Sequence, residues 1–257
     1  MKRVITALVL IPAVSWVIFL APYPVFWIVV AAFAALCYRE YTRLVRESGY
    51  EPFAVPGYAI GLLLLAGIGE TLALLPMLTA VAGLALALRN DDLKHALPSA
   101  GAFALGVFYI FGAWNAALVL WRIHPGWLFF AVALNWAGDI AAFYVGRAMG
   151  KRKLAPIVSP GKSWEGAIAS ALAAMIFGGV LLHYVDPLFA PWKAVALAFA
   201  GNVAGQLGDL AESALKRGAG VKDSGTMLPG HGGWLDRLDS SLFSMPVVAA
   251  LLSLLRG

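Results

Sequence analysis

Long apolar runs alternate with short polar intervals along the whole chain. Runs of about 20 apolar residues are long enough to cross a hydrocarbon core of roughly 30 Å as helices. The pattern predicts about nine such helices, near residues 4–21, 25–38, 57–73, 74–88, 98–120, 127–149, 165–184, 192–211 and 242–256. The junction between the third and fourth helices is the least defined, because Gly69 and Pro76 both interrupt the pattern there. The fold class expected is therefore an all-α polytopic membrane protein.

Composition agrees with this expectation. The chain has 257 residues, of which 61% are hydrophobic and 13% are charged, whereas a soluble domain has about 25% charged residues. We expect one transmembrane domain over residues 1–257, with no separate soluble domain. The N-terminal stretch resembles a signal peptide but lacks a small-x-small cleavage site, so it is interpreted as a retained first helix. The single cysteine, Cys37, is expected to be a small buried residue.

The distribution of lysine and arginine predicts the topology. If the N-terminus is cytoplasmic, all of these residues except Arg122, Lys193 and Arg256 fall on the cytoplasmic side, as the positive-inside rule requires. The polar loops at 151–162 and 212–240 then both face the cytoplasm. The net charge of +5 is a topology signal and an attraction to anionic headgroups; no nucleic-acid-binding module is recognisable. The loop at 38–56 is expected to be a short interfacial segment.

Two predicted helices carry a polar face. On the eighth helix, five residues at spacings of 4, 3, 4 and 3 share one face: Asn202, Gln206, Asp209, Ser213 and Lys216. On the sixth, the shared face comprises Asn135, Asp139, Ala142, Gly146 and Gly150. An aspartate near mid-membrane costs roughly 2.5–3.5 kcal/mol on insertion scales, so Asp139 should line a polar cavity open to the cytoplasm. For the two asparagines, a structural clamp between helices stays an alternative.

Small residues at a spacing of four recur along the chain. The pairs Gly57/Gly61, Gly146/Gly150 and Gly201/Gly205 are expected to let neighbouring helices approach closely.

The stretch 159–166 contains Gly-Lys-Ser but does not match a phosphate-binding Walker loop. That pattern needs a glycine five residues before Gly161, where the chain has Pro156, and we expect no β-strand before it. We expect a helix start instead, with Ser163 as the N-cap and Glu165 in the first turn. Together with Lys162, the free N–H groups there would make an anion site; plain capping beside a lysine is the alternative.

The polar stretch 212–240 combines carboxylates, basic residues and glycines. Asp209 and Glu212 lie one helical turn apart, and Asp236 and Asp239 repeat that spacing at the head of the last helix. Paired carboxylates can hold Mg²⁺, which prefers oxygen ligands and keeps water and substrate phosphates in its shell. Basic residues between the pairs would bind phosphate oxygens. Surface ion pairs flanking helix ends are the alternative interpretation.

The same stretch resembles the signature of the phosphatidate cytidylyltransferases, also called CDP-diglyceride synthases. The matching residues are Ser213-x-x-Lys216-Arg217, Lys222-Asp223, Pro229-Gly230-His231-Gly232-Gly233 and Asp236-Arg237-x-Asp239. The run 139–150 and the loop 159–166 are also similar to that family. Two positions depart from the pattern: Trp234 replaces the usual aliphatic residue, and Gly161 stands where a second basic residue is expected.

The resemblance implies the reaction of CTP with phosphatidic acid to give CDP-diacylglycerol and pyrophosphate, with Mg²⁺ required and a second cation left open. The site is expected mainly in 135–166 and 202–240. The catalytic residues are expected to be Lys216, Arg217, Lys222, Asp223, His231 and Arg237. Substrate binding is expected from Lys162, Ser163, Asn202, Ser213, Gly232 and Gly233. The metal ligands are expected among Asp139, Asp209, Asp236 and Asp239.

Two other classes of membrane protein fit the sequence less well. The CDP-alcohol phosphotransferases carry Asp-Gly-x-x-Ala-Arg followed by further aspartates, and the chain has no such run. A transporter would explain buried polar faces, but not a metal and phosphate region on one side, and no inverted repeat is visible. The expected location is a bacterial inner membrane, in contact with lipid, with cytoplasmic site loops; a homodimer is left open.

Overall fold

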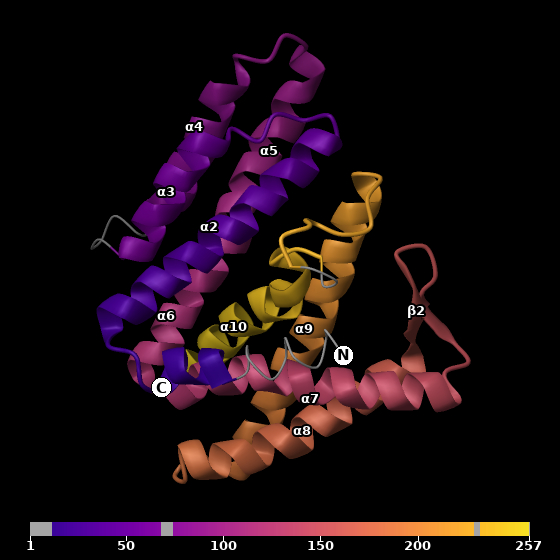
Figure 1. The fold of residues 1–257 in the computed structure, drawn as a ribbon. Helices are drawn as coiled ribbons and strands as arrows, with labels where there is room; N and C mark the ends of the chain where they lie inside the picture. Colours follow the sequence, from indigo (N-terminus) through magenta and orange to yellow (C-terminus); the bar gives the residue numbers. More distant parts are fainter. Residues whose placement is uncertain (1–11, 68–73, 229–231, 257) are drawn as a thin grey trace. The chain divides into compact units, whose positions relative to one another are not determined.

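The structure, a computed structural model, describes residues 12–67, 74–228 and 232–256. It is almost entirely helical (Figure 1). Residues 12–19 form a first helix. The α-helices that follow are α2 (Tyr23–Glu47), α3 (Ala54–Ala66), α4 (Leu75–Ala87), α5 (Ala96–Gly106), α6 (Ala113–Ile123), α7 (Pro125–Met149), α8 (Trp164–Val185), α9 (Pro191–Gly218) and α10 (Leu235–Arg256). A 3₁₀ turn, η2 (Leu93–His95), leads into α5, and a π-helix, η3 (Val107–Gly112), joins α5 to α6.

Within the described part of the chain, six helical runs are long and apolar enough to cross a membrane. They are Tyr23–Glu47, Leu93–Ile123, Pro125–Met149, Trp164–Val185, Pro191–Gly218 and Leu235–Arg256. Helices α3 and α4 are apolar but have only 13 residues each. The chain is therefore an all-α, multi-pass membrane protein, as expected, and the count of nine spans stays a prediction.

The chain forms two compact units. Of the described residues, unit 1 comprises 22–67, 74–118, 215–228 and 232–237, and unit 2 comprises 12–21, 119–214 and 238–256.

In unit 1, helices α2 to α5 lie side by side (Figure 1). The helices approach closely where glycines meet aromatic rings. A Cβ atom on Gly57 would collide with the Tyr38 ring, and one on Gly61 would collide with the Phe111 ring, so the predicted close approach at this glycine pair is confirmed. Helix α2 is also tied to α3 by the Trp27 indole, which donates to the Leu65 carbonyl at 3.2 Å.

The predicted helix end near residue 38, with a loop over 38–56, is wrong, because α2 continues to Glu47; the interfacial location of this stretch stays a prediction. Tyr38, Tyr41, Leu44 and Val45 are all buried, and their spacing of three and four residues makes one packed helical face. Packing of this face stabilises two further turns of helix despite the neighbouring charges. The helix ends at Ser48, and Gly49 follows with a φ of 87°, which glycine adopts at little cost.

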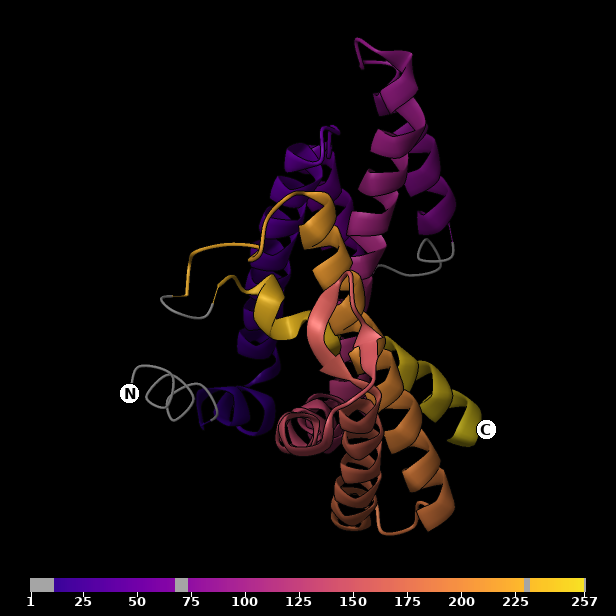
Figure 2. The same cartoon turned by 90° about the vertical axis from the view of Figure 1, so that its right-hand side faces the viewer.

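In unit 2, helices α7 and α8 pack side by side and are joined at one end by a hairpin (Figures 1 and 2). The hairpin consists of β1 (Lys153–Ala155) and β2 (Ser159–Ser163), paired antiparallel with Lys153 opposite Ser163. The expectation of no strand near the Gly-Lys-Ser stretch is therefore wrong. The two strands are short and belong to one loop. Because so few residues alternate between apolar and polar, the sequence pattern does not predict these strands.

Helix α9 packs against α7, α8 and α10 through small residues. A Cβ atom on Gly205 would collide with the Asn135 amide of α7, and one on Gly201 would lie 2.9 Å from Val248 of α10. A Cβ atom on Gly178 of α8 would lie 2.6 Å from the Ala198 Cβ atom of α9. The predicted role of the Gly201/Gly205 pair is confirmed, and this close packing brings the polar face of α9 next to that of α7.

Candidate functional site

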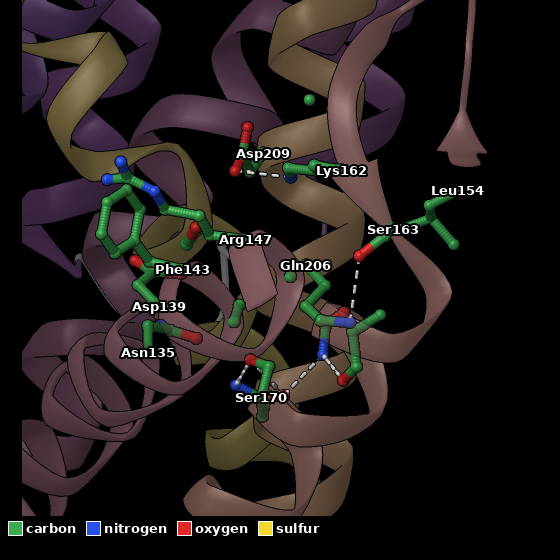
Figure 3. Close-up of a pocket in the computed structure, with 17 residues that line it drawn as sticks. Asn135, Asp139, Phe143, Arg147, Leu154, Lys162, Ser163, Ser170, Gln206 and Asp209 are labelled. Atoms are coloured by element: carbon green, nitrogen blue, oxygen red, sulfur yellow. Dashed lines mark hydrogen bonds and ion pairs between the residues drawn. The ribbon is translucent and has the colours of Figure 1, made fainter. Parts of the chain in front are cut away.

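Unit 2 contains a polar pocket of about 320 Å³ (Figure 3). It is lined by residues of α7, the hairpin, α8, α9 and the start of α10. The lining residues are Asn135, Asp139, Ala142, Phe143, Gly146, Arg147, Leu154, Gly161, Lys162, Ser163, Gly166, Ala167, Ser170, Asn202, Gln206, Asp209 and Ser240. Side chains of both charges thus meet beside helices that are apolar enough to cross a membrane.

The predicted polar face of α7 forms one wall. Asn135, Asp139, Ala142 and Gly146 all line the pocket, at the helical spacing that the sequence predicted. Asp139 thus lines a polar cavity, as expected. Arg147 lines it as well and was not among the predicted site residues. Its position next to Gly146 is the signal that could have identified it.

The polar face of α9 forms the facing wall. Asn202, Gln206 and Asp209 line the pocket, and the Ser213 hydroxyl lies 3.5 Å from Asp209 Oδ1. Lys162, on strand β2, places its Nζ atom 2.5 Å from Asp209 Oδ2 (Figure 3). The hairpin therefore brings a cation directly onto the aspartate of α9.

A chain of amide and hydroxyl groups lies at the bottom of the pocket. Gln206 Nε2 donates to Asn202 Oδ1 at 2.7 Å and to the Ala167 carbonyl at 3.2 Å. Asn202 Nδ2 donates to Ser170 Oγ at 3.2 Å. On the α7 side, Asn135 Nδ2 donates to Ser244 Oγ at 2.9 Å. The two asparagines therefore clamp helices together and also line the pocket, so both alternatives hold for them.

The start of α8 has the predicted geometry. Ser163 is the N-cap residue and its Oγ accepts a hydrogen bond from the Gly166 N–H at 3.2 Å. Glu165 lies in the first turn, and its carboxylate accepts from the Arg152 N–H at 3.3 Å, which ties the hairpin to the helix. Lys162 and Ser163 thus enter the pocket next to a helix N-terminus, where anions are favoured.

In unit 1, the segment 215–237 contains a second polar cluster centred on Asp236. Lys216 Nζ lies 2.6 Å from Asp236 Oδ1. The other carboxylate oxygen accepts from the Ser224 N–H at 2.9 Å and the Gly233 N–H at 2.7 Å, and it lies 2.9 Å from the Ser224 hydroxyl oxygen. Asp236 therefore organises the glycine-rich loop as well as pairing with a lysine.

Comparison with known proteins identifies the family of this chain. A sequence model described as "Cytidylyltransferase family" matches residues 1–255. The chain belongs to this family. It is 38% identical to the phosphatidate cytidylyltransferase of Pseudomonas aeruginosa over 273 aligned positions, which cover 98% of this chain and 96% of the relative. It is 37% identical to the enzyme of the same name from Brucella suis over 259 positions, which cover 98% and 91%. The resemblance predicted from the signature is confirmed, and the chain is a member of an enzyme family.

The remaining predicted residues are not among those that line the pocket of unit 2. Arg217 donates to the Val221 carbonyl at 3.2 Å, and three further signature residues are exposed: Lys222, Asp223 and Arg237. Gly232 has a φ of 78°, so its place in the turn favours glycine. His231 lies outside the described residues.

The predicted metal ligands fall into two groups. Asp139 and Asp209 line the pocket of unit 2. Asp239 lies near it in sequence, beside the lining residue Ser240, whose N–H donates to Asp239 Oδ1 at 2.7 Å, and Asp236 lies in the polar cluster of unit 1. Across residues 12–67, 74–228 and 232–256, no group of three or more His, Cys, Asp or Glu residues gathers into a metal site. The pocket therefore offers two carboxylates, together with amide and hydroxyl oxygens.

One buried acidic residue was not predicted from the sequence. Glu40, on α2, is only 4% exposed, and its carboxylate accepts hydrogen bonds from the segment that carries the signature. Its sequence surroundings, Tyr-Arg-Glu-Tyr, indicate an interfacial helix end, and no local pattern distinguishes it from Glu47.

Proposed function

We propose that this protein transfers the cytidylyl group of CTP to phosphatidic acid, giving CDP-diacylglycerol and pyrophosphate. Membership of the cytidylyltransferase family supports the reaction class. The observation that carries the proposal is the pocket of unit 2, which is lined by Arg147 and Lys162 together with Asp139 and Asp209. A pocket with both charges suits a polyanion that is bound together with a cation.

The cationic side of the pocket would bind phosphate oxygens. The Lys162 ammonium is already directed into the pocket by its contact with Asp209, and Arg147 supplies a second positive charge. The Ser163 hydroxyl and the N-terminus of α8 lie next to Lys162 and add hydrogen-bond donors. These groups would orient a phosphate and balance its charge.

The anionic side has the donor set that Mg²⁺ prefers. The pocket is lined by carboxylate, amide and hydroxyl oxygens, and hard oxygen donors of this kind suit magnesium. Asp139 and Asp209 would hold the ion, and Lys162 would then be free to move from Asp209 to a substrate phosphate. When bound, magnesium would neutralise negative charge on the phosphates.

The reaction is proposed to be a direct displacement. The second pKa of a phosphate monoester is about 6, so phosphatidic acid arrives deprotonated near neutrality and needs no general base. One of its phosphate oxygens attacks the α-phosphorus of CTP, the bond from that phosphorus to the bridging oxygen of the β-phosphate breaks, and pyrophosphate leaves. The protein's part is to bring two anions together in line and to offset their charge.

A covalent alternative would use His231 as the nucleophile, with a cytidylyl-imidazole intermediate. The two mechanisms differ when lipid is absent. A covalent intermediate would allow labelled pyrophosphate to exchange into CTP without phosphatidic acid, whereas direct displacement requires the lipid. We expect no exchange without lipid; rapid lipid-independent exchange that is lost in His231→Ala would show the covalent route.

We also propose that the protein acts in a bacterial inner membrane, with its site loops in the cytoplasm, where soluble CTP is available. The decisive experiment is product analysis. Detergent-purified protein incubated with labelled CTP, phosphatidic acid and Mg²⁺ should release labelled CDP-diacylglycerol, and it should release none when either substrate is omitted. Absence of this product when both substrates and Mg²⁺ are present would refute the proposal.

A further inference from the structure

Glu40 is a buried acid on α2 that lies far in sequence from the signature residues. Its two carboxylate oxygens accept three hydrogen bonds, all from one segment of unit 1. Oε1 accepts from the Trp234 N–H at 3.0 Å. Oε2 accepts from the Leu235 N–H at 2.8 Å and from the Ser224 hydroxyl at 2.8 Å. Glu40 therefore connects Ser224 to the start of α10 at Trp234 and Leu235.

Two of these donors belong to the start of α10, which begins at Leu235. The first N–H groups of a helix have no partner within the helix, and a negative charge is favourable there. A carboxylate on another helix thus acts as the cap of α10. Gly233 and Gly225 allow it to come this close, because a Cβ atom on either residue would collide with the Glu40 carboxylate.

Glu40 also shares a hydroxyl group with Asp236. The Ser224 Oγ atom lies 2.8 Å from Glu40 Oε2 and 2.9 Å from Asp236 Oδ2. A hydroxyl group has one proton and therefore donates to one carboxylate at a time. The positions of the two carboxylates are consequently coupled through Ser224, which is itself buried.

We propose that Glu40 is a positioning residue of the reaction, which presets the signature segment for phosphate binding. Lys222 and Arg237 flank this segment and are exposed, and Lys216 contacts Asp236 within it. Holding Ser224 and the start of α10 in place before substrate arrives removes an ordering cost from binding. This inference rests on the proposed function for its kinetic part only.

The test compares Glu40→Gln with Glu47→Gln. Glu47 is on the same helix and in an ion pair with Arg43 at 2.7 Å, so the control removes the same charge at a partly exposed position. In Glu40→Gln, the new amide can accept from some of the three donors but presents an N–H₂ group to the others. We expect kcat/KM for CTP to fall by about tenfold or more in Glu40→Gln, as loss of a charged hydrogen bond predicts, and to stay within about twofold of the parent in Glu47→Gln.

Hydrogen exchange provides a readout that does not depend on activity. Backbone amides of 224–236 should exchange faster in Glu40→Gln while those of α7 and α8 remain unchanged. Unchanged exchange in 224–236 would overturn the proposal. So would a loss of activity in Glu40→Gln that is fully explained by a smaller fraction of folded protein. If the parent protein makes no CDP-diacylglycerol, the proposed function fails, and the exchange result still decides whether Glu40 holds the segment.

A double-mutant cycle with Ser224→Ala tests the coupling. Both changes remove the hydrogen bond between Glu40 and the Ser224 hydroxyl, so the double variant should lose less activity and protection than the sum of the two single losses. Additive losses would show that the two residues act independently and would contradict coupling through the shared hydroxyl.

Discussion

At the scale of single residues, the ion pair between Lys162 and Asp209 is partly open to solvent, and this limits what it contributes to the stability of the fold. The two side chains are 27% and 31% exposed, and ion pairs of this kind contribute about 0–1 kcal/mol to stability. Their contribution to folding is therefore small. The position of the pair inside a polar pocket points to ligand binding instead.

The first prediction follows from this small contribution. Asp209→Asn and Asp139→Asn should each lower kcat/KM by about a hundredfold or more, because an amide keeps the shape of the side chain but loses the charge that would hold Mg²⁺. The melting temperature in detergent should change little. Steady-state kinetics over a range of Mg²⁺ concentrations would measure the effect.

Asp186→Asn is the matched control for these variants. Asp186 also pairs with a basic side chain, Arg256, at 2.5 Å, but it follows α8 at the end away from the hairpin. The activity of Asp186→Asn should match that of the parent protein. Near-normal turnover in both pocket variants would remove the two aspartates from the site.

At the scale of elements, the close packing of α9 against α7 positions the two polar faces. Gly205 makes this possible, because a Cβ atom there would collide with the Asn135 amide. Asn135 in turn donates to Ser244 of α10. One small residue therefore controls the distance between two helices and the hydrogen bond that reaches a third.

The second prediction is that Gly205→Ala destabilises the protein by about 1–3 kcal/mol, the usual cost of overpacking. Thermal unfolding in detergent would measure the loss of stability. The activity of Gly205→Ala should also fall, because Asn135 must move. Gly101→Ala on α5 is the control, since nothing lies within 4 Å of a Cβ atom there. Equal melting temperatures for the two variants would contradict the role of Gly205.

At the scale of the whole molecule, helices α8 and α9 separate three loops, and the number of helices between two loops predicts whether they lie on the same side of the membrane. Ile157 precedes α8, Leu188 lies between α8 and α9, and Thr226 follows α9. The first two side chains are 91% and 97% exposed, and Thr226 is also exposed. If both helices cross the membrane, the loops at 157 and 226 share one side and the loop at 188 is on the other.

The third prediction uses single cysteines at these positions in a background where Cys37 is replaced. Cysteines at 157 and 226 should react with an impermeant thiol reagent only from the cytoplasmic side, and one at 188 only from the opposite side. Intact and inverted membrane vesicles would distinguish the two. Labelling of 157 and 226 from opposite faces would contradict the predicted topology.

Several features of this protein were determined by the sequence itself, because each depends on neighbouring residues. The apolar runs predict the membrane helices, and spacings of three and four residues place Asn135, Asp139 and Gly146 on one face. The cap at Ser163 depends on residues within one turn of it. The signature at 213–239 identifies the family because its residues are close together in the chain.

Other features were decided only by tertiary structure. Glu40 and Leu235 are 195 positions apart, and nothing around Glu40 distinguishes a buried cap from a solvated acid at a helix end. Leu154, on β1, lines the pocket because the hairpin folds back against α8. Burying a carboxylate is favourable only when donors surround it, and those donors are brought together by folding. The sequence thus determines which groups are available, and packing determines which of them meet.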